Sequence, residues 1–201
     1  MSTSSIQHRD PAAAAQVPAA TRTTWQIDPA HTAAEFAVKH LMISTVRGHF
    51  GTVTGVVHAN ETDPRETTLE VDIAVASIDT RNEQRDAHLR SPDFLDAERF
   101  PSLTFRSKRV EGDPNATLRV VGDLTIRGVT REIVLEVESE GRTRDPWGND
   151  RAGFSAKAKL SRKDFGLTWN QLLEAGGVSV GDEVKIAIDV ELVKQKAQAA
   201  A

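Results

Sequence analysis

Hydrophobic and polar residues alternate along most of this chain with a period of two. Ala34, Phe36 and Val38 share one face of their segment, and the residues between them share the other. The same alternation recurs at positions 69–75, 118–126, 132–137, 154–160 and 184–192. Because successive side chains of a strand point to opposite faces, this pattern predicts antiparallel strands with one face in water.

Turn signals and short connections separate these predicted strands. Pro, Gly, Asn and Asp gather at positions 60–64, 112–115 and 145–150, and Arg127-Gly128 is short enough for a tight hairpin. About eight strands with mostly short connections favour an all-β, antiparallel, up-and-down β-barrel. A β-sandwich gives the same alternation and is the alternative. Inward faces that mix Leu, Ile and Val with Gly and Ala favour the barrel, because a tapered or ligand-holding barrel needs both sizes.

One segment, residues 77–105, interrupts the alternation and is crowded with charges. Thr80 or Asn82 is a suitable N-cap for a helix over residues 83–89, which Pro92 ends, and residues 93–99 form a further turn or two. The sequence therefore predicts a short helical cap between two strands. Residues 163–177 form a second irregular segment that is richer in apolar side chains, and we interpret it as a second candidate lid.

Length and composition fit one domain with two tails. The chain has 201 residues, and residues 1–23, rich in Ala, Ser, Thr and Pro, are predicted to form a disordered tail. The folded domain is expected over residues 24–193 and a flexible tail over residues 194–201. No basic start followed by an apolar core marks a signal peptide, so we expect a cytoplasmic protein. No apolar run approaches the ~20 residues of a membrane span, so no stable membrane insertion is expected.

Charge and residue types exclude several classes of function. A formal net charge of −4 argues against bulk electrostatic attraction to nucleic acid or to an anionic membrane, and no nucleic-acid partner is predicted. The chain has no cysteine, which excludes disulfides, thiolate chemistry and cysteine-bound metals. No Gly-rich phosphate loop occurs, and we predict no cofactor.

Four histidines recur at intervals of nine residues, His31, His40, His49 and His58. An odd interval reverses the face along a strand, and no HExxH or His-x-His pair occurs, so we predict no metal site. His40 continues the face of Phe36 and Val38, which places an imidazole at the end of an apolar wall. It is either a hydrogen-bonded rim histidine or a ligand contact.

Charged residues of the predicted cap allow two interpretations. Arg81, Arg85, Asp86, His88 and Arg90 form either a solvated helix face with ordinary ion pairs or a rim that meets the polar head of a bound amphiphile. Nearby carboxylates are not coupled to a base, a nucleophile or a carbonyl-binding site. We therefore predict that the protein is not an enzyme, and His40 beside a carboxylate is the one weak alternative.

Several blocks of the sequence together resemble the YceI-like family. The resemblance covers about residues 24–193 and follows the same order throughout. The blocks are WQIDPAH from Trp25, FAVKH from Phe36, VRGHF from Val46, SIDT from Ser77, RDAHL from Arg85, DFLD from Asp93, FP from Phe100, GDLTIRG from Gly122 and RKDFG from Arg162.

The resemblance implies a lipocalin-like barrel that encloses an elongated apolar ligand, typically a polyisoprenoid such as a polyprenyl quinone precursor. It implies a binding or carrier protein with a long-chain lipid as partner, and it implies a homodimer as one arrangement, as for its relatives. The competing hypothesis is a structural or stress-associated barrel that its own side chains fill and that acts through its surface. The matching positions near the ligand, with Trp169 of the second candidate lid added, are Phe36, Val38, His40, Phe50, His88, Phe94, Phe105, Phe165 and Trp169.

Overall fold

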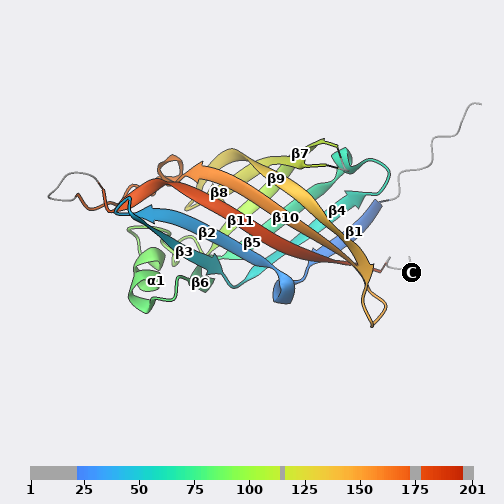
Figure 1. Ribbon diagram of the computed structural model, residues 1–201, viewed down its shortest axis with the longest axis horizontal. Coiled ribbons are helices and arrows are strands. Elements are labelled where there is room, and N and C mark those ends of the chain that lie inside the picture. Colours follow the sequence, from blue (N-terminus) through green and yellow to red (C-terminus); the bar gives the residue numbers. More distant parts are fainter. Residues whose placement is uncertain (1–21, 114–115, 173–177, 197–201) are drawn as a thin grey trace, which may run out of the picture.

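The computed structural model describes residues 22–113, 116–172 and 178–196 (Figure 1). The strands are β1 Arg22–Ile27, β2 Ala33–His40, β3 Ser44–Phe50, β4 Val53–Asn60, β5 Thr68–Ala74, β6 Ile78–Asp79, β7 Ser102–Gly112, β8 Leu118–Ile126, β9 Val129–Arg144, β10 Asp150–Ser161 and β11 Val180–Lys194. The helix is α1 Glu83–Arg90, and the short 3-10 helices are η1 Pro29–His31, η2 Pro64–Glu66, η3 Val75–Ser77 and η4 Arg162–Phe165. Arg22, Thr23 and Lys194, which the sequence predicts to belong to the tails, are strand residues of β1 and β11. Residues 1–21 and 197–201 of the predicted tails lie outside the described residues.

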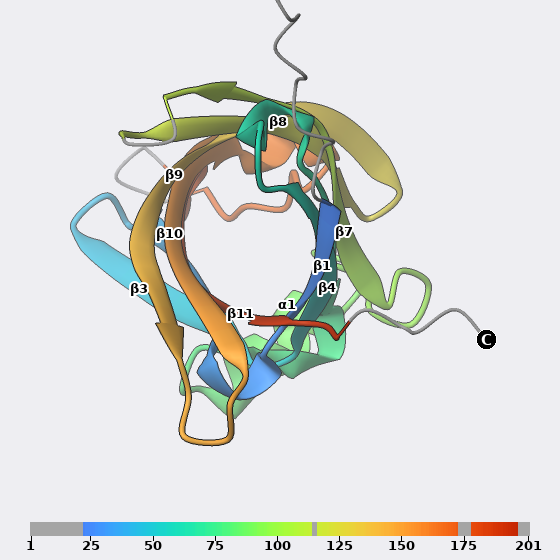
Figure 2. The same cartoon turned by 90° about the vertical axis from the view of Figure 1, so that its right-hand side faces the viewer.

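The strands form one closed antiparallel barrel, seen along its axis in Figure 2. The ring of eight runs β1-β4-β5-β7-β8-β9-β10-β11 and closes through pairing of β1 with β11. Neighbouring strands in this ring pair antiparallel, and each hairpin returns along the barrel. The predicted up-and-down barrel is confirmed, and the sandwich alternative is wrong.

At two positions in the barrel wall, two strands lie in line and together act as one interrupted strand. β1 and β2 both pair with β11, and the short helix η1 lies between them, so they act as one strand with a break. On the other side β1 pairs with β4 and β2 pairs with β3, which makes β3 and β4 a second broken strand. In β2 Ala34 is buried and Glu35 exposed as the alternation predicts, but Phe36, Ala37 and Val38 are all half-buried.

The barrel has two distinct ends (Figure 1). We call the end that carries α1, the β2–β3 hairpin and residues 162–172 the lid end. The opposite end, with the start of β1 and the β9–β10 connection, is the floor end. The described residues contain no helix that is long and apolar enough to cross a membrane.

The predicted cap is confirmed as helix α1. The Asn82 side chain accepts a hydrogen bond from the Arg85 backbone N–H at 2.9 Å and so caps the first turn. Residues 91–100 follow as hydrogen-bonded turns, in which the Phe100 N–H donates to the Asp96 carbonyl. Phe94 and Leu95, each 7% exposed, anchor the cap to the barrel core.

Glycines inside the barrel make room for the protein's own rings. A Cβ atom at Gly122 would lie 2.5 Å from the Phe105 ring, and one at Gly48 would lie 2.4 Å from the Phe36 ring. The small residues at these two positions therefore accommodate Phe105 and Phe36 and do not themselves leave space for a ligand.

The two walls of the barrel differ in how tightly they pack. On β7 and β8 the inward residues are buried, including Leu103, Phe105 and Leu124 at 6–7% exposed. On β11 the inward Ile186, Ile188 and Val190 are only half-buried, whereas Leu192, nearer the floor end, is buried. The interior is therefore packed along β7 and β8 and accessible along β11.

Candidate functional site

Three rings meet at the lid end of the barrel. The His88 ring, on α1, lies edge-on to Phe94 at 5.0 Å and to Trp169 at 4.7 Å between ring centroids. Phe94 and Trp169 are 5.1 Å apart in a tilted arrangement. Edge-to-face packing of this kind stabilises a cluster without burying all of it. His88 and Trp169 stay half-buried and can contact a ligand at the mouth.

The segment that carries Trp169 is fixed by a buried arginine. Arg162 is 3% exposed and donates to the carbonyls of Leu167 at 2.6 Å, Trp169 at 2.8 Å and Gly181 at 2.9 Å. Burial lowers the pKa of the Arg162 guanidinium, and the nearby Asp182 opposes that shift. A fourth carbonyl, that of Val180, accepts at 3.3 Å. Because one side chain binds carbonyls of two segments, Arg162 sets the position of Trp169 relative to β11.

Polar residues of the cap mainly hold the cap in place. Buried Asp86 accepts hydrogen bonds from the Thr80 N–H at 2.9 Å and the Thr80 hydroxyl at 2.5 Å. Arg85 donates to the same hydroxyl at 2.7 Å and to the Thr80 carbonyl at 2.8 Å. The interpretation of these residues as a solvated face is therefore wrong for Asp86, which bonds within the cap.

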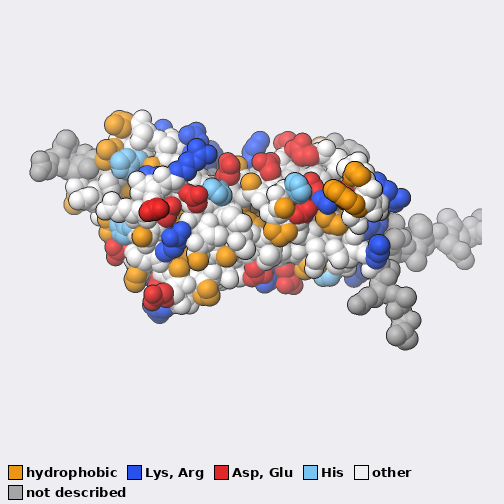
Figure 3. All heavy atoms as spheres, turned by 90° about the horizontal axis from the view of Figure 1, so that it is seen from below, with side chains coloured by type: hydrophobic (Ala, Val, Ile, Leu, Met, Phe, Trp, Pro, Cys, Tyr) orange, Lys and Arg blue, Asp and Glu red, His pale blue; other side chains and the backbone are white. Residues whose placement is uncertain are grey.

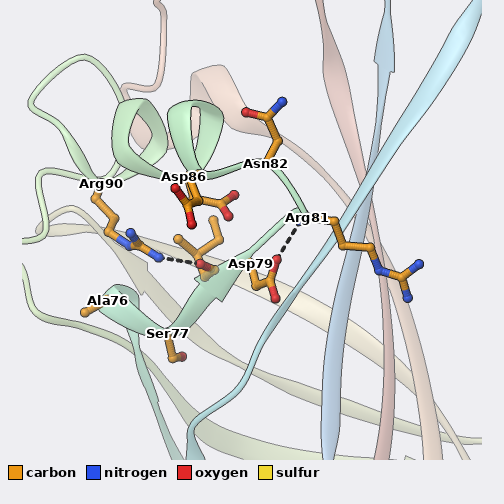
Figure 4. Close-up of a pocket in the computed structure, with 9 residues that line it drawn as sticks. Ala76, Ser77, Asp79, Arg81, Asn82, Asp86 and Arg90 are labelled. Atoms are coloured by element: carbon orange, nitrogen blue, oxygen red, sulfur yellow. Dashed lines mark hydrogen bonds between the residues drawn. The ribbon is translucent and has the colours of Figure 1, made fainter.

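A polar cavity of about 560 Å³ lies against α1 (Figure 4). Arg90 donates to the Ile78 carbonyl at 2.7 Å, and its buried Nε has no hydrogen-bond partner among the described residues. Arg81 extends away from the helix, and its backbone N–H donates to Asp79 at 2.6 Å. The cavity is lined by both arginines and carboxylates, so a ligand there can meet hydrogen-bond donors as well as acceptors. Its lining residues are Ala76, Ser77, Ile78, Asp79, Arg81, Asn82, Glu83, Asp86 and Arg90.

The structure places most of the predicted ligand-near residues in one apolar cluster. Its members among them are Phe36, Phe50, Phe94, Phe105, Phe165 and Trp169.

Within this cluster the Phe36 and Phe50 rings are 5.7 Å apart. Phe165 is 1% exposed, so its ring packs within the core and is not itself accessible to a ligand. Val38 is half-buried farther along β2, and His40 lies exposed at the end of that strand. Residues 173–177 of the second candidate lid lie outside the described residues.

Charged residues at the floor end form a dense ion-pair network. Arg151 is paired with Asp28 at 2.7 Å, with Asp145 at 2.8 Å and with Glu191. Hydrogen bonds from Arg151 and His31 lower the pKa of Asp28 to about 2. Burial raises the pKa of Asp145, but hydrogen bonds from Arg151 and Asn149 outweigh it and hold that pKa below its usual range.

One of the four regularly spaced histidines, His31, belongs to this network. Asp28, His31 and Glu191 bring three potential ligand atoms within 4.8 Å of one another. The Arg151 guanidinium already pairs with both carboxylates and supplies the positive charge that a cation would bring. His40, His49 and His58 lie on other strands and do not join this group.

Sequence reasoning missed the residues whose partners are distant in the chain. Arg162 binds across 19 residues to Gly181, and Arg151 binds across 123 residues to Asp28. The only local signal for Arg162 is an arginine directly after a strand pattern, inside the RKDFG block. No local signal identifies Arg151, because its environment exists only in the closed barrel.

Comparison with known proteins identifies relatives over nearly the whole barrel. A family model described as a YceI-like domain matches residues 25–192. UPF0312 proteins of Staphylococcus aureus strains N315 and Mu50 are 37% identical over 170 residues, which is 84% of this chain and 96% of theirs.

Solved structures show the same barrel. A Campylobacter jejuni YCEI protein is 34% identical with a TM-score of 0.67, covering 79% of this chain and 90% of its own. Burkholderia cenocepacia BcnA, at 21% identity, has a TM-score of 0.71 over 82% of this chain and 98% of its own. A polyisoprenoid binding domain from Saccharophagus degradans, at 13% identity, has a TM-score of 0.61 over 86% and 99%. The last two likenesses establish the fold alone.

Proposed function

The chain belongs to the YceI-like family, and on that premise we propose that it is a binding or carrier protein for an elongated amphiphile, in particular a polyisoprenoid lipid. The tail lies inside the barrel, and the polar head lies at the lid end. The name of the Saccharophagus degradans domain gives that ligand class for a protein of the same fold.

The accessible wall of the barrel is the observation that carries this proposal. Inward side chains of β11, including Ile186, Ile188 and Val190, are half-buried, whereas a barrel filled by its own side chains buries such residues. The opposite wall, on β7 and β8, is packed. An apolar tail laid along β11 would complete the burial of these side chains.

Residues of the lid end suit a polar head. The half-buried rings of His88 and Trp169 each have an apolar face and a polar nitrogen. The Asp93 carboxylate Oδ2 lies 3.0 Å from His88 Nε2. The cavity against α1 adds the cationic side chains of Arg81 and Arg90 and several carboxylates. We propose that the head contacts this rim, while His40 lies too exposed to contribute much binding energy.

Apolar burial gives sufficient energy for binding. At ~0.8 kcal/mol per buried methylene, about fifteen methylene equivalents contribute roughly 12 kcal/mol before the cost of ordering the tail. The binding free energy left after this cost corresponds to a dissociation constant on the order of micromolar to nanomolar. Because nonspecific apolar contacts dominate, selectivity should depend more on tail length than on the head.

A ring that fills the accessible wall tests the proposal. Ile188 pairs with Ala34 and Ala156 on the neighbouring strands, so Ile188→Trp places an indole among small residues. Calorimetric titration with prenyl alcohols of increasing length should show about tenfold weaker binding to this variant, with an unchanged or higher Tm.

The matched control is Ala187→Trp, which places the same ring on the wet face of the same strand. It should bind like the wild type. Equal affinities of wild type and Ile188→Trp, or no binding of any prenyl alcohol to the wild type, would favour the surface-acting alternative.

A further inference from the structure

Three large aliphatic side chains project into solvent at the lid end. Met42 is 60% exposed, and Ile43 and Leu172 are each 83% exposed. They lie on neighbouring segments, because the Leu41 N–H donates to the Ser179 carbonyl at 2.9 Å and Leu172 pairs with Val178. We call Met42, Ile43 and Leu172 the apolar tip. The end that carries it is on the left of Figures 1 and 3, and Figure 3 shows hydrophobic side chains on the surface there.

The hairpin that carries the tip adopts an unfavourable backbone for its residues. Leu41 and Met42 have φ values of +51° and +60°, in the left-handed region. The β8–β9 hairpin has the same sign of φ at Arg127 and Gly128, where glycine relieves the strain. Bulky apolar residues at two left-handed positions destabilise a hairpin. The stability of this hairpin therefore does not explain why Leu41 and Met42 occupy these positions.

Charge around the tip favours an anionic partner. The described tip segments, residues 39–45 and 168–172, contain no carboxylate, and Glu174 follows Leu172 by two residues in the sequence. Lys39 and His40 lie beside the tip, so any attraction is local to it, because the chain as a whole carries a formal net charge of −4. Neither Lys39 nor His40 forms an ion pair within the described part of the chain. Trp147, the exposed aromatic at the floor end, has two carboxylates, Asp145 and Asp150, within three residues in the sequence and no adjacent lysine.

The shape of the tip favours a lipid surface over a protein surface. A stable protein interface buries about 800 Å² and some 20–30 residues on each partner, and three side chains on two loop tips fall far short. A bilayer interface takes up a few projecting aliphatic side chains and attracts neighbouring cations through its anionic head groups.

We propose that the apolar tip docks the barrel, lid end first, on an anionic bilayer surface, where the amphiphile can pass between bilayer and barrel. The docking itself stands on the tip alone, and its role in loading rests on the proposed function. It is a peripheral contact of loop tips and requires no span of the membrane.

Vesicle co-sedimentation tests the docking. The probe is phosphatidylcholine vesicles with about one third phosphatidylglycerol. The variant Leu41→Asn/Met42→Gly should bind about tenfold more weakly than the wild type, and Leu172→Gln should also weaken binding. Because Asn-Gly suits left-handed turn positions, the double variant should keep or raise Tm, so lost binding is not lost folding. Trp147→Ser is the control and should bind vesicles like the wild type.

Ligand measurements separate this proposal from the proposed function. The double variant should bind a prenyl alcohol in vesicle-free solution with wild-type affinity but take it up from vesicles more slowly. Wild-type protein that binds the alcohol but not the vesicles overturns the docking. Vesicle binding that the tip variants abolish, without any alcohol binding, overturns the carrier function and leaves the docking. A dimer in analytical ultracentrifugation that depends on the tip, without vesicle binding, overturns the docking in favour of a second copy.

Discussion

The lid end and the floor end of the barrel each contain a tryptophan and a buried or partly buried arginine, but they use them differently. Trp25 at the floor is 3% exposed and packs with Ile27 and Leu192, while Arg142 lies over its ring at 5.3 Å. Trp169 at the lid is half-buried in a cluster with His88 and Phe94. The floor end closes the core, and the lid end leaves aromatic edges accessible.

The arginines differ in the same sense. Arg151 binds three carboxylates from three parts of the chain, and so it locks the floor end. Arg162 binds backbone carbonyls of one short segment and β11, and so it positions an irregular segment without joining the whole barrel. We infer that the floor end serves stability and the lid end serves binding.

Truncating the two tryptophans should give the largest contrast. Trp25→Ala should lower the free energy of unfolding by about 3–5 kcal/mol, because it empties a buried site. Trp169→Ala should lower it by about 1–2 kcal/mol, because that ring is half-buried, but should weaken prenyl binding about tenfold. Urea unfolding and calorimetric titration measure the two effects. Equal losses of stability, or a larger loss of binding in Trp25→Ala, would contradict the division of roles.

Removing the buried arginine of the lid end should have a smaller effect on stability. Arg162→Met leaves the carbonyls of Leu167 and Trp169 without a donor, which we expect to cost about 2–3 kcal/mol in urea unfolding. The emission of Trp169, in a chain without the other tryptophans, should shift to longer wavelength as its segment loosens.

The control for this change is Lys163→Met. Lys163 is next in sequence and pairs with Asp182 at 2.8 Å, but both side chains are about half exposed. Its loss should change stability by less than about 1 kcal/mol. A larger effect for Lys163 than for Arg162 would mean that surface charge, and not the buried hydrogen bonds, holds this segment.

Acid should destabilise the floor end before the lid end. Near neutral pH the free energy of unfolding should hardly change with pH. Folding lowers the pKa of Asp28 to about 2 and that of Asp145 below its usual range. Such carboxyls stabilise the fold above their unfolded pKa, about 3.9, and lose that contribution as the pH falls through the folded value. The urea midpoint should therefore fall between about pH 4 and pH 2.

The variant Asp28→Asn/Asp145→Asn sharpens this prediction. It should be less stable than the wild type at pH 7, and its urea midpoint should depend less on pH in the acid range. An acid response as steep as that of the wild type would place the responsible carboxyls elsewhere.

Local signals predicted the elements that local interactions form. Asn82 and Pro92 bound α1 as expected, and Arg127-Gly128 forms a hairpin turn with left-handed φ at both residues. The barrel itself followed from alternation and short connections. The same logic failed for the glycines, because Gly48 and Gly122 accommodate the rings of Phe36 and Phe105 on the paired strands, and alternation alone does not show which ring fills the space.

Contacts that depend on closure of the ring could not be predicted. Arg151 meets Asp28 because β1 and β10 both flank β11, and no pattern around Arg151 encodes that neighbour. The packing difference between the β8 and β11 walls also depends on which rings fill the interior. Which of the nine predicted residues touch a ligand therefore stays a prediction.

Mass spectrometry of organic extracts tests the central claim most directly. Wild-type protein, Ile188→Trp and Ala187→Trp would be purified from the same host without detergent and extracted in parallel. We predict a long-chain isoprenoid in near-stoichiometric amount with the wild type and with Ala187→Trp, and a strongly reduced amount with Ile188→Trp. The absence of any lipid from the wild type, or equal lipid in all three, would contradict a carrier that holds its ligand along β11.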